Sequence, residues 1–414
     1  INYEDKVKRK IGIPDFFVLL QRYSESELIK LTFKLLMMRH TLLILMLLAC
    51  GMSASAQLTL KSEKGDFEAR LIGRALFDGG VFFSDKTALG NSLEVYDVRL
   101  GTVVRFLERW TGKIELGFAK SKVSMKDVYI EYSDGKNLFK VGHCFEPFSL
   151  EYRIGTSDMK FNGAAVTGTA FGDRRRLGIS YTYNCDVLNV SGGVFSDKDI
   201  DNTEKDDEGY AFSGRVLYRP YSRGKDIIHI GVSSRFGVQG KAEENKLTYS
   251  AGAPSNLIPE KFLKAEVTEA INEWKFGAEV VMVLDKWYFQ SEYLMAHVNR
   301  RASVENYNGD GWYAQVGYAL LNGRYGYNKT SGMATAPGAK SLEILCRYNI
   351  TNMNDKDSGI MGGKQNDFSI GGIYYFNKYV AAKMSYSLVS LDKHAPVDGK
   401  QTFSMIQGRI QLSF

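Results

Sequence analysis

The stretch Ile406-Gln407-Gly408-Arg409-Ile410-Gln411-Leu412-Ser413-Phe414 alternates strictly between two kinds of side chain. Even-numbered positions are apolar or glycine, and odd-numbered positions are polar or charged. Alternation with a period of two predicts a β-strand whose two faces lie in different environments. A soluble sheet with one wet face could produce this pattern, as could a membrane barrel with an apolar outer face and a hydrated lumen.

The same alternation recurs along the chain in segments long enough to cross a bilayer. Apolar and aromatic residues on one face oppose polar or charged residues on the other in 112–118, 127–132, 274–282, 287–295, 312–320 and 380–388. At the tilt found in barrels, strands of about 9–11 residues cross the membrane. Trp274, Trp287 and Trp312 lie at predicted strand ends, where an interfacial aromatic girdle is expected.

The connections between the predicted strands alternate in length, as expected of a barrel with long outer loops and short inner turns. The long polar segments are 78–91, 144–173, 197–208, 238–260, 301–310, 352–365 and 393–400, and the tight links are 108–111, 133–136, 184–186, 220–225, 285–286 and 377–378. A short outer hairpin is expected near 120–123, a two-residue turn at Asn377-Lys378 and one long inner connection at 321–340. With 162–171 assigned to the third outer loop, the pattern predicts an all-β transmembrane antiparallel β-barrel of about 16 strands.

Composition fits a strand-rich membrane protein better than a soluble α/β enzyme. The 414 residues include 41 Gly and only 7 Pro, with Tyr and Phe abundant at 24 each, which suits many strands with aromatic belts. The formal charge is +6 and no basic run is interleaved with aromatic residues, so we expect no nucleic-acid partner. Cys144, Cys185 and Cys346 are widely spaced, and we expect three unpaired thiols.

An export signal is predicted in the N-terminal part of the sequence. Arg39 precedes the apolar run Thr41–Ala49, which is too short for a spanning helix, and Ala54-Ser55-Ala56 supplies a cleavage motif. The predicted division is an over-extended translation start at 1–36, a signal peptide at 37–56 and the barrel at 57–414. Leu47-Leu48-Ala49-Cys50 leaves a lipoprotein signal as the alternative.

No catalytic signature accompanies the strand pattern. The sequence contains no Gly-x-Ser-x-Gly elbow, His-Glu-x-x-His pair, P-loop or EF-hand loop. His143, His229, His297 and His394 are scattered over distant segments and are expected to be wall or loop residues. We therefore predict no enzyme activity, no cofactor and no metal site. An outer-membrane hydrolase with a serine near His143 or His394 is the alternative from the enzyme class.

Several short motifs follow one another in a specific order. They are Asp127-Val128-Tyr129, Val141-Gly142, Pro147-Phe148-Ser149-Leu150-Glu151, Gly209-Tyr210-Ala211-Phe212, Ile228-His229-Ile230-Gly231 and Trp312-Tyr313-Ala314-Gln315. In this order, over most of 67–414, they resemble the phosphate-selective porin O and P family. A strand ending in Phe414 likewise resembles the C-terminal signal of outer-membrane barrels. The family resemblance implies a trimeric 16-stranded pore with a third loop that folds inward and narrows the channel. It also implies basic residues on the wall and inward loops that conduct phosphate or other anions.

Strand parity turns charged side chains of both signs toward the lumen. Arginine suits phosphate because its planar guanidinium can bind two oxygens at once. With Arg153 and Lys160 of the third loop (144–173) included, the candidate anion-binding and pore-lining residues are Arg70, Arg74, Arg99, Arg105, Lys113, Lys140, Arg153, Lys160, Arg215, Arg347, Lys383 and Arg409. Arg174–Arg176, just after this loop, are not included. Carboxylates on the same faces leave open a hydrated wall of paired ions without selectivity.

Together these features predict a Gram-negative outer-membrane channel for passive diffusion of small anions, with phosphate as the candidate solute. The expected partners are outer-membrane lipid and further copies of the chain in a homotrimer. Two alternatives stay open. One is a general diffusion porin without anion selectivity, and the other is a non-conducting barrel that captures a ligand or anchors a surface structure.

Overall fold

The computed structural model describes residues 59–119, 122–197, 200, 209–240 and 245–414. The predicted translation start and signal peptide lie outside these residues, as does most of the acidic segment 197–208. In the described ranges no helix is long and apolar enough to cross a membrane.

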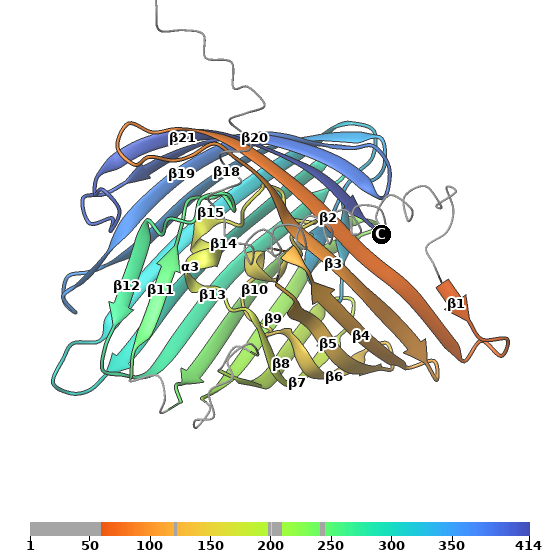
Figure 1. Cartoon of the computed structure of the whole chain (residues 1–414). Coiled ribbons are helices and arrows are strands. Elements are labelled where there is room, and N and C mark those ends of the chain that lie inside the picture. The colour runs from red at the N-terminus through yellow and green to blue at the C-terminus, as the bar shows by residue number, and fades with distance from the viewer. Residues whose placement is uncertain (1–58, 120–121, 198–199, 201–208, 241–244) are drawn as a thin grey trace, which may run out of the picture. The chain divides into compact units, whose positions relative to one another are not determined.

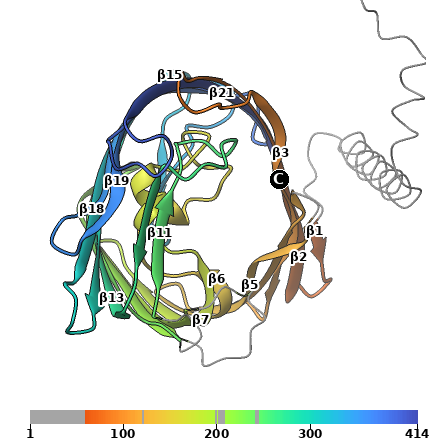
Figure 2. The same ribbon diagram turned by 60° about the vertical axis from the view of Figure 1, so that its left-hand side comes forward.

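Sixteen antiparallel strands close into a barrel (Figures 1 and 2). In chain order they are β2 (Phe67–Phe83), β3 (Ser92–Phe106), β4 (Trp110–Gly117), β5 (Ser124–Ser133), β6 (Asn137–Phe145), β7 (Arg175–Asn184), β8 (Leu188–Ser196), β9 (Tyr210–Arg223), β10 (Asp226–Val238), β13 (Ala270–Leu284), β14 (Trp287–Arg300), β15 (Tyr307–Leu321), β18 (Ser341–Asp355), β19 (Ile360–Tyr375), β20 (Val380–Leu391) and β21 (Gln401–Ser413). The ring closes where β2 pairs with β21, from Arg74 opposite Ser413 to Phe83 opposite Ser404. The short β1 (Thr59–Lys61) pairs with residues 68–70 of β2, which lie before the part of β2 that pairs with β21. The predicted barrel and strand number are confirmed.

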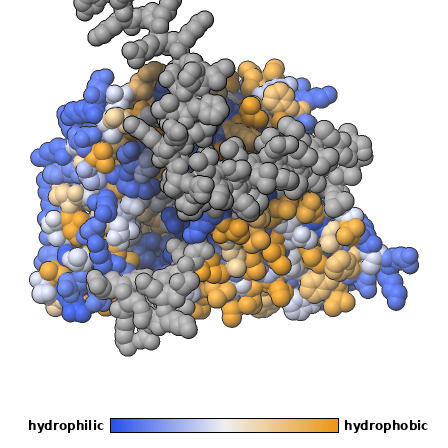
Figure 3. Space-filling model, viewed as in Figure 1, coloured by the Kyte–Doolittle hydropathy of each residue, from blue (hydrophilic) through white to orange (hydrophobic). Residues whose placement is uncertain are grey.

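The outer face carries an apolar band between aromatic rows. Exposed Trp312 and buried Tyr313 are neighbours on β15, as alternation predicts. Trp287 lies at one end of β14, and His297, ten residues along, pairs with Trp274 on β13. At the strand rise and tilt of barrels this spacing is about 24 Å, close to the roughly 25 Å height of an apolar band. Figure 3 shows apolar side chains gathered at lower right, around the part of the wall labelled β3–β5 in Figure 1, between more polar rims.

One detail of the predicted girdle is corrected. Trp287 does begin its strand, but Trp274 and Trp312 lie several residues inside β13 and β15. The reason is that these strands continue beyond the apolar band. The turn predicted at Asn377-Lys378 is also longer than two residues and spans 376–379. Within it, Asn377 Oδ1 accepts hydrogen bonds from the backbone N–H groups of Tyr379 (2.8 Å) and Val380 (2.9 Å).

The two ends of the barrel differ in their connections. Short turns such as 107–109, 134–136 and 285–286 join strands at one end, here called the turn end. The longer connections lie at the opposite end, here called the loop end. One of those predicted to be long, 352–365, is instead the four-residue turn 356–359, because β18 and β19 extend to Asp355 and from Ile360. The predicted exception is confirmed, because the connection 322–340 is long and lies at the turn end.

Three connections fold into the lumen. The third loop (146–174) contains the 3-10 turn η2 (Glu151–Arg153) and the short helix α3 (Val166–Phe171). The fifth loop (239–269) contains the hairpin β11 (Leu247–Ala251) and β12 (Leu263–Val267). The turn-end hairpin consists of β16 (Gly326–Asn328) and β17 (Met333–Thr335). Figure 2 shows α3 and β11 inside the ring of strands. The assignment of 162–171 to the third loop is correct, although its helix was not predicted.

Apolar contacts fix these three insertions against the strands from β9 onward and against β2. Phe171 of α3 packs on Tyr249 of β11, and both belong to a buried cluster with residues of β14 and β18. Phe262 of the fifth loop packs on Phe403 of β21. Tyr325, beside the turn-end hairpin, packs on Tyr288 of β14. Because burial of each large side chain contributes about 1.5–3 kcal/mol, these contacts favour fixed rather than loose insertions.

Candidate functional site

An open cavity of about 470 Å³ remains between the third loop and the wall on the side of β3, β5, β6 and β7. It is lined by Tyr96, Arg99, Met125, Lys126, His143, Phe145, Tyr152, Ile154, Gly155, Thr156, Met159, Ala164, Thr169, Arg174, Arg175, Ile200 and Asn256. The opposite side of the lumen is occupied by the insertions, so the cavity is the eccentric space that they leave.

The charge of this lining is of one sign. Arg99, Lys126, Arg174 and Arg175 are basic, and no Asp or Glu is among the lining residues within the described ranges. His143 Nδ1 lies 2.5 Å from the backbone oxygen of Lys126. Because a carbonyl oxygen can only accept, this ring nitrogen is the donor. A solute in the cavity therefore meets basic groups from three strands and a loop.

Carboxylates stand behind two of these cations and fix their positions. Arg175 Nε donates to Asp127 Oδ1 at 2.5 Å, and its guanidinium lies 3.8 Å from the centre of the Phe145 ring. Arg99 Nε lies 2.9 Å from Asp97 Oδ2. An arginine held through Nε keeps further N–H donors for a ligand. The carboxylates reduce the local positive charge, and they also hold the two arginine side chains in one position.

Of the twelve residues proposed from sequence, Arg99 is the one that lines this cavity. Three others are paired on the same wall: Arg74 lies 3.5 Å from Asp97, Lys113 lies 2.6 Å from Asp127, and Lys140 lies 3.0 Å from Glu131. Arg70 lies on β2, and Arg105 is exposed near the turn end of β3. These positions are lumenal or rim positions outside the cavity.

Four further members of the set hold the third loop in place. Lys383 Nζ donates to the backbone oxygen of Met159 (2.7 Å), Arg347 Nη1 to that of Gly163 (3.1 Å), and Arg409 Nη1 to that of Thr156 (3.0 Å). Lys160 points from the third loop onto Glu343, with bonds of 2.9 and 3.0 Å. All four side chains are buried, which places them in contacts between loop and wall.

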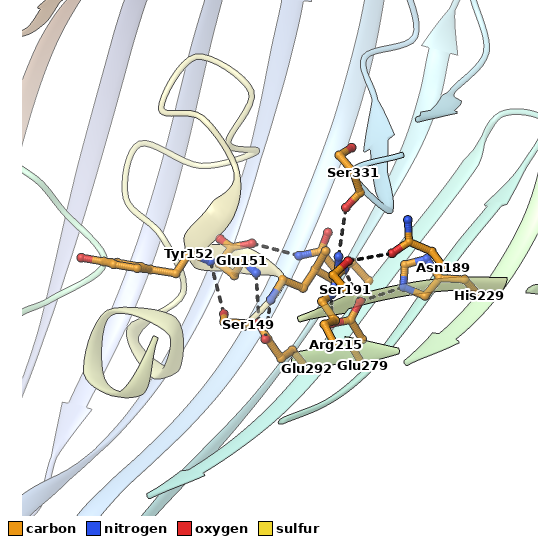
Figure 4. A network of polar contacts seen from close by, with 12 residues as sticks. Ser149, Glu151, Tyr152, Asn189, Ser191, Arg215, His229, Glu279, Glu292 and Ser331 are labelled. Atoms are coloured by element: carbon orange, nitrogen blue, oxygen red, sulfur yellow. Dashed lines mark hydrogen bonds and ion pairs between the residues drawn. The ribbon is translucent and has the colours of Figure 1, made fainter. Parts of the chain in front are cut away.

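Buried carboxylates complete this anchoring (Figure 4). Glu292 of β14 accepts the backbone N–H groups of Leu150 (2.6 Å) and Glu151 (3.1 Å) at the start of η2. Glu279 of β13 pairs with Arg215 at 2.5 Å, and Arg215 also donates to the backbone oxygen of Ser331 at 3.0 Å. One network thus joins the third loop, the wall and the turn-end hairpin. Arg153 lies in η2, and its Nε and Nη1 have no hydrogen-bond partner in the described part of the chain.

Sequence reasoning missed three of the four cavity cations for local reasons. Lys126 lies at a β-bulge, where two residues oppose Glu115 and simple parity fails. Arg174 and Arg175 were set aside because they follow the third loop, yet the loop returns to the wall there and places them on the cavity. The signal that could have found them is the uninterrupted run Arg174-Arg175-Arg176 at the junction between loop and strand.

A closed 16-stranded barrel with an inward third loop, similar in fold to solved porins, defines an outer-membrane porin. The chain belongs to the phosphate-selective porin O and P family, which matches residues 73–414. A relative from Caulobacter vibrioides, described as an uncharacterized protein, is 25% identical over 391 residues, which cover 87% of this chain and 78% of the relative.

Solved porin structures share the fold. The anion-selective porin from Comamonas acidovorans superposes with a TM-score of 0.55 at 12% identity, covering 84% of this chain and 100% of that one. The outer membrane channel DcaP of Acinetobacter baumannii gives 0.54 at 15% identity, covering 86% and 99%. OmpT of Vibrio cholerae in its trimer form gives 0.55 at 11% identity, covering 84% and 99%. At these identities the likeness concerns the fold alone.

Proposed function

We propose that this porin is a passive channel that favours small anions, with phosphate as the candidate solute. The observation that carries the proposal is the cavity lining, which contains four basic side chains and no carboxylate in the described ranges. A water-filled passage with walls of one sign raises the local concentration of counter-ions. The family name and the anion-selective porin of Comamonas acidovorans support the same reading.

The roles of the charged side chains differ under this proposal. Arg99, Lys126, Arg174 and Arg175 contact the passing anion. Lys160, Arg215, Arg347, Lys383 and Arg409 keep the insertions in place, because each donates a hydrogen bond to a carboxylate or to a backbone oxygen of an insertion. Selectivity is expected to be moderate, since carboxylates lie directly behind Arg99 and Arg175.

The cellular setting forms part of the proposal. We expect export through the predicted signal peptide (37–56), insertion into the outer membrane with the turn end facing the periplasm, and assembly as a homotrimer in contact with outer-membrane lipid. Both a catalytic role and a non-conducting, ligand-capturing role are set aside in favour of conduction, because an open cavity lies beside the third loop.

Phosphate block of the chloride current through single channels tests the role of the cavity. Removing one cation about 4 Å from a bound anion costs roughly 1–4 kcal/mol at the dielectric constants of a wet protein surface. The double variant Arg174→Gln/Arg175→Gln should therefore weaken phosphate block at least about fivefold. The matched control Arg300→Gln/Arg301→Gln, at the loop-end rim, should leave it unchanged. Equal block in all three proteins would reject the assignment.

A further inference from the structure

The lining of the cavity contains more apolar surface than a hydrated inorganic ion can use. Large aromatic or aliphatic side chains share the lining with the cations. Tyr96 and Phe145 come from the wall, and Tyr152, Ile154 and Met159 come from the facing third loop. Inorganic phosphate gains nothing from such surface, because its oxygens need hydrogen-bond donors on every side.

The apolar and basic groups are also close to each other. The Arg175 guanidinium stacks on the Phe145 ring with 3.8 Å between its central carbon and the ring centre. A ligand held by the cations would therefore have its other end beside an aromatic ring.

The size of the cavity agrees with a larger solute. A volume of about 470 Å³ falls within the roughly 300–1,000 Å³ of sites that hold small organic molecules, which are lined by apolar side chains with a few placed polar groups. A phosphate ion occupies only a small part of such a space.

We propose that the cavity prefers organic anions, in which a phosphate or carboxylate group carries an aromatic or aliphatic body, over inorganic phosphate. The anionic group meets Arg99, Lys126, Arg174 and Arg175, and the body lies against Phe145, Tyr152 and Ile154. This inference rests on the proposed anion channel and names its class of solute.

Block of the single-channel chloride current by three probes tests the preference. Inorganic phosphate, methyl phosphate and phenyl phosphate share the anionic group and differ in the body attached to it. With the wild-type channel, phenyl phosphate should reach half-block at a concentration at least about tenfold lower than inorganic phosphate, because its ring is removed from water. Methyl phosphate should lie close to inorganic phosphate.

Two substitutions show whether the named side chains are responsible. Phe145→Ser and the smaller, more polar Ile154→Thr should each reduce the advantage of phenyl phosphate over inorganic phosphate at least about threefold. Val304→Thr, in the loop-end connection 301–306, should retain the full advantage. If Phe145→Ser does not insert, Ile154→Thr still decides, since it removes only one heavy atom.

The outcomes separate this inference from the proposed function. Equal block by phenyl and inorganic phosphate in an anion-selective channel would overturn the preference for organic anions and leave the anion channel intact. An advantage that survives in both variants would overturn the assignment of the apolar surface. A cation-selective channel that none of the probes blocks would overturn both proposals.

Discussion

At the scale of single residues, Asp127 is a carboxylate that pairs with a cation of the cavity. It lies 2.6 Å from Lys113 Nζ and 2.5 Å from Arg175 Nε, so it neutralises part of the positive wall. Asp127→Asn should therefore raise the anion preference of the channel and strengthen phosphate block by roughly fivefold. Reversal potentials in a salt gradient, compared with those of Asp310→Asn at the loop end, measure the effect. A lower anion preference would contradict the assignment.

A second residue-scale prediction concerns two carboxylates near Arg235. Burial raises the pKa of Glu146, despite Arg235 3.2 Å away. Burial alone would raise the pKa of Asp173 as well, but Arg235 and Lys275 outweigh it and hold that pKa below its usual range. A raised carboxyl pKa means that folding disfavours the ionised form, so this contribution to stability grows as the pH falls through the raised pKa. A carboxyl group whose pKa is lowered by folding, such as Asp173, stabilises the fold at pH values above its unfolded pKa. That stabilisation is lost as the pH falls through the folded pKa.

The two substitutions should accordingly differ at neutral pH. Asp173→Asn removes the carboxylate 3.0 Å from Lys275 and should cost roughly 3 kcal/mol in the free energy of unfolding. Glu146→Gln should change it by less than about 1 kcal/mol, because it removes a charge that burial disfavours. Urea unfolding of the detergent-solubilised barrel at pH 7 measures both values. A larger loss for Glu146→Gln would contradict the difference in their environments.

At the scale of elements, Glu343 of β18 connects two insertions to the wall. It accepts hydrogen bonds from Lys160 of the third loop (2.9 and 3.0 Å) and from Tyr325 (2.5 Å) beside the turn-end hairpin. Glu343→Gln leaves the buried Lys160 ammonium without its counter-charge, which costs about 3–5 kcal/mol. We expect a looser third loop and rapid current fluctuations in single-channel records.

The double variant Lys160→Met/Glu343→Gln provides the control for that prediction. Removing both charges leaves no unpaired ion, so the current should become quieter than in Glu343→Gln alone. A double variant that is as noisy as the single one would show that the ion pair does not anchor the loop.

Elements also mark where sequence reasoning reached its limit. The strands were predictable because alternation persists over many residues, as in 274–282 and 312–320, and the lengths of the connections showed which end was which. The inward third loop was predictable from the family resemblance, but its helix and the turn-end hairpin were not, because Val166–Phe171 and the three-residue strands β16 and β17 are too short for a period to emerge. Parity correctly turned Lys383 and Arg409 inward, but their burial depends on where the third loop packs, which no local pattern encodes.

At the scale of the whole molecule, the insertions make the lumen asymmetric. The third loop, the fifth loop and the turn-end hairpin pack their apolar side chains against β9–β21 and β2, whereas the cavity lies beside β3–β7. Replacing 326–335 by a short Gly-Ser link should therefore open a second passage at the turn end and raise single-channel conductance to about 1.5 times the wild-type value. An unchanged conductance would show that the turn-end hairpin does not restrict the lumen.

The central claim is that the open part of this lumen favours anions, and the reversal potential of the wild-type channel tests it most directly. The purified protein would be inserted into a neutral planar bilayer with a tenfold gradient of potassium chloride. The cavity lining contains four cations and, within the described ranges, no carboxylate. The reversal potential should therefore have the sign set by chloride. In Arg174→Gln/Arg175→Gln it should move toward zero. A potential with the sign set by potassium would contradict the claim.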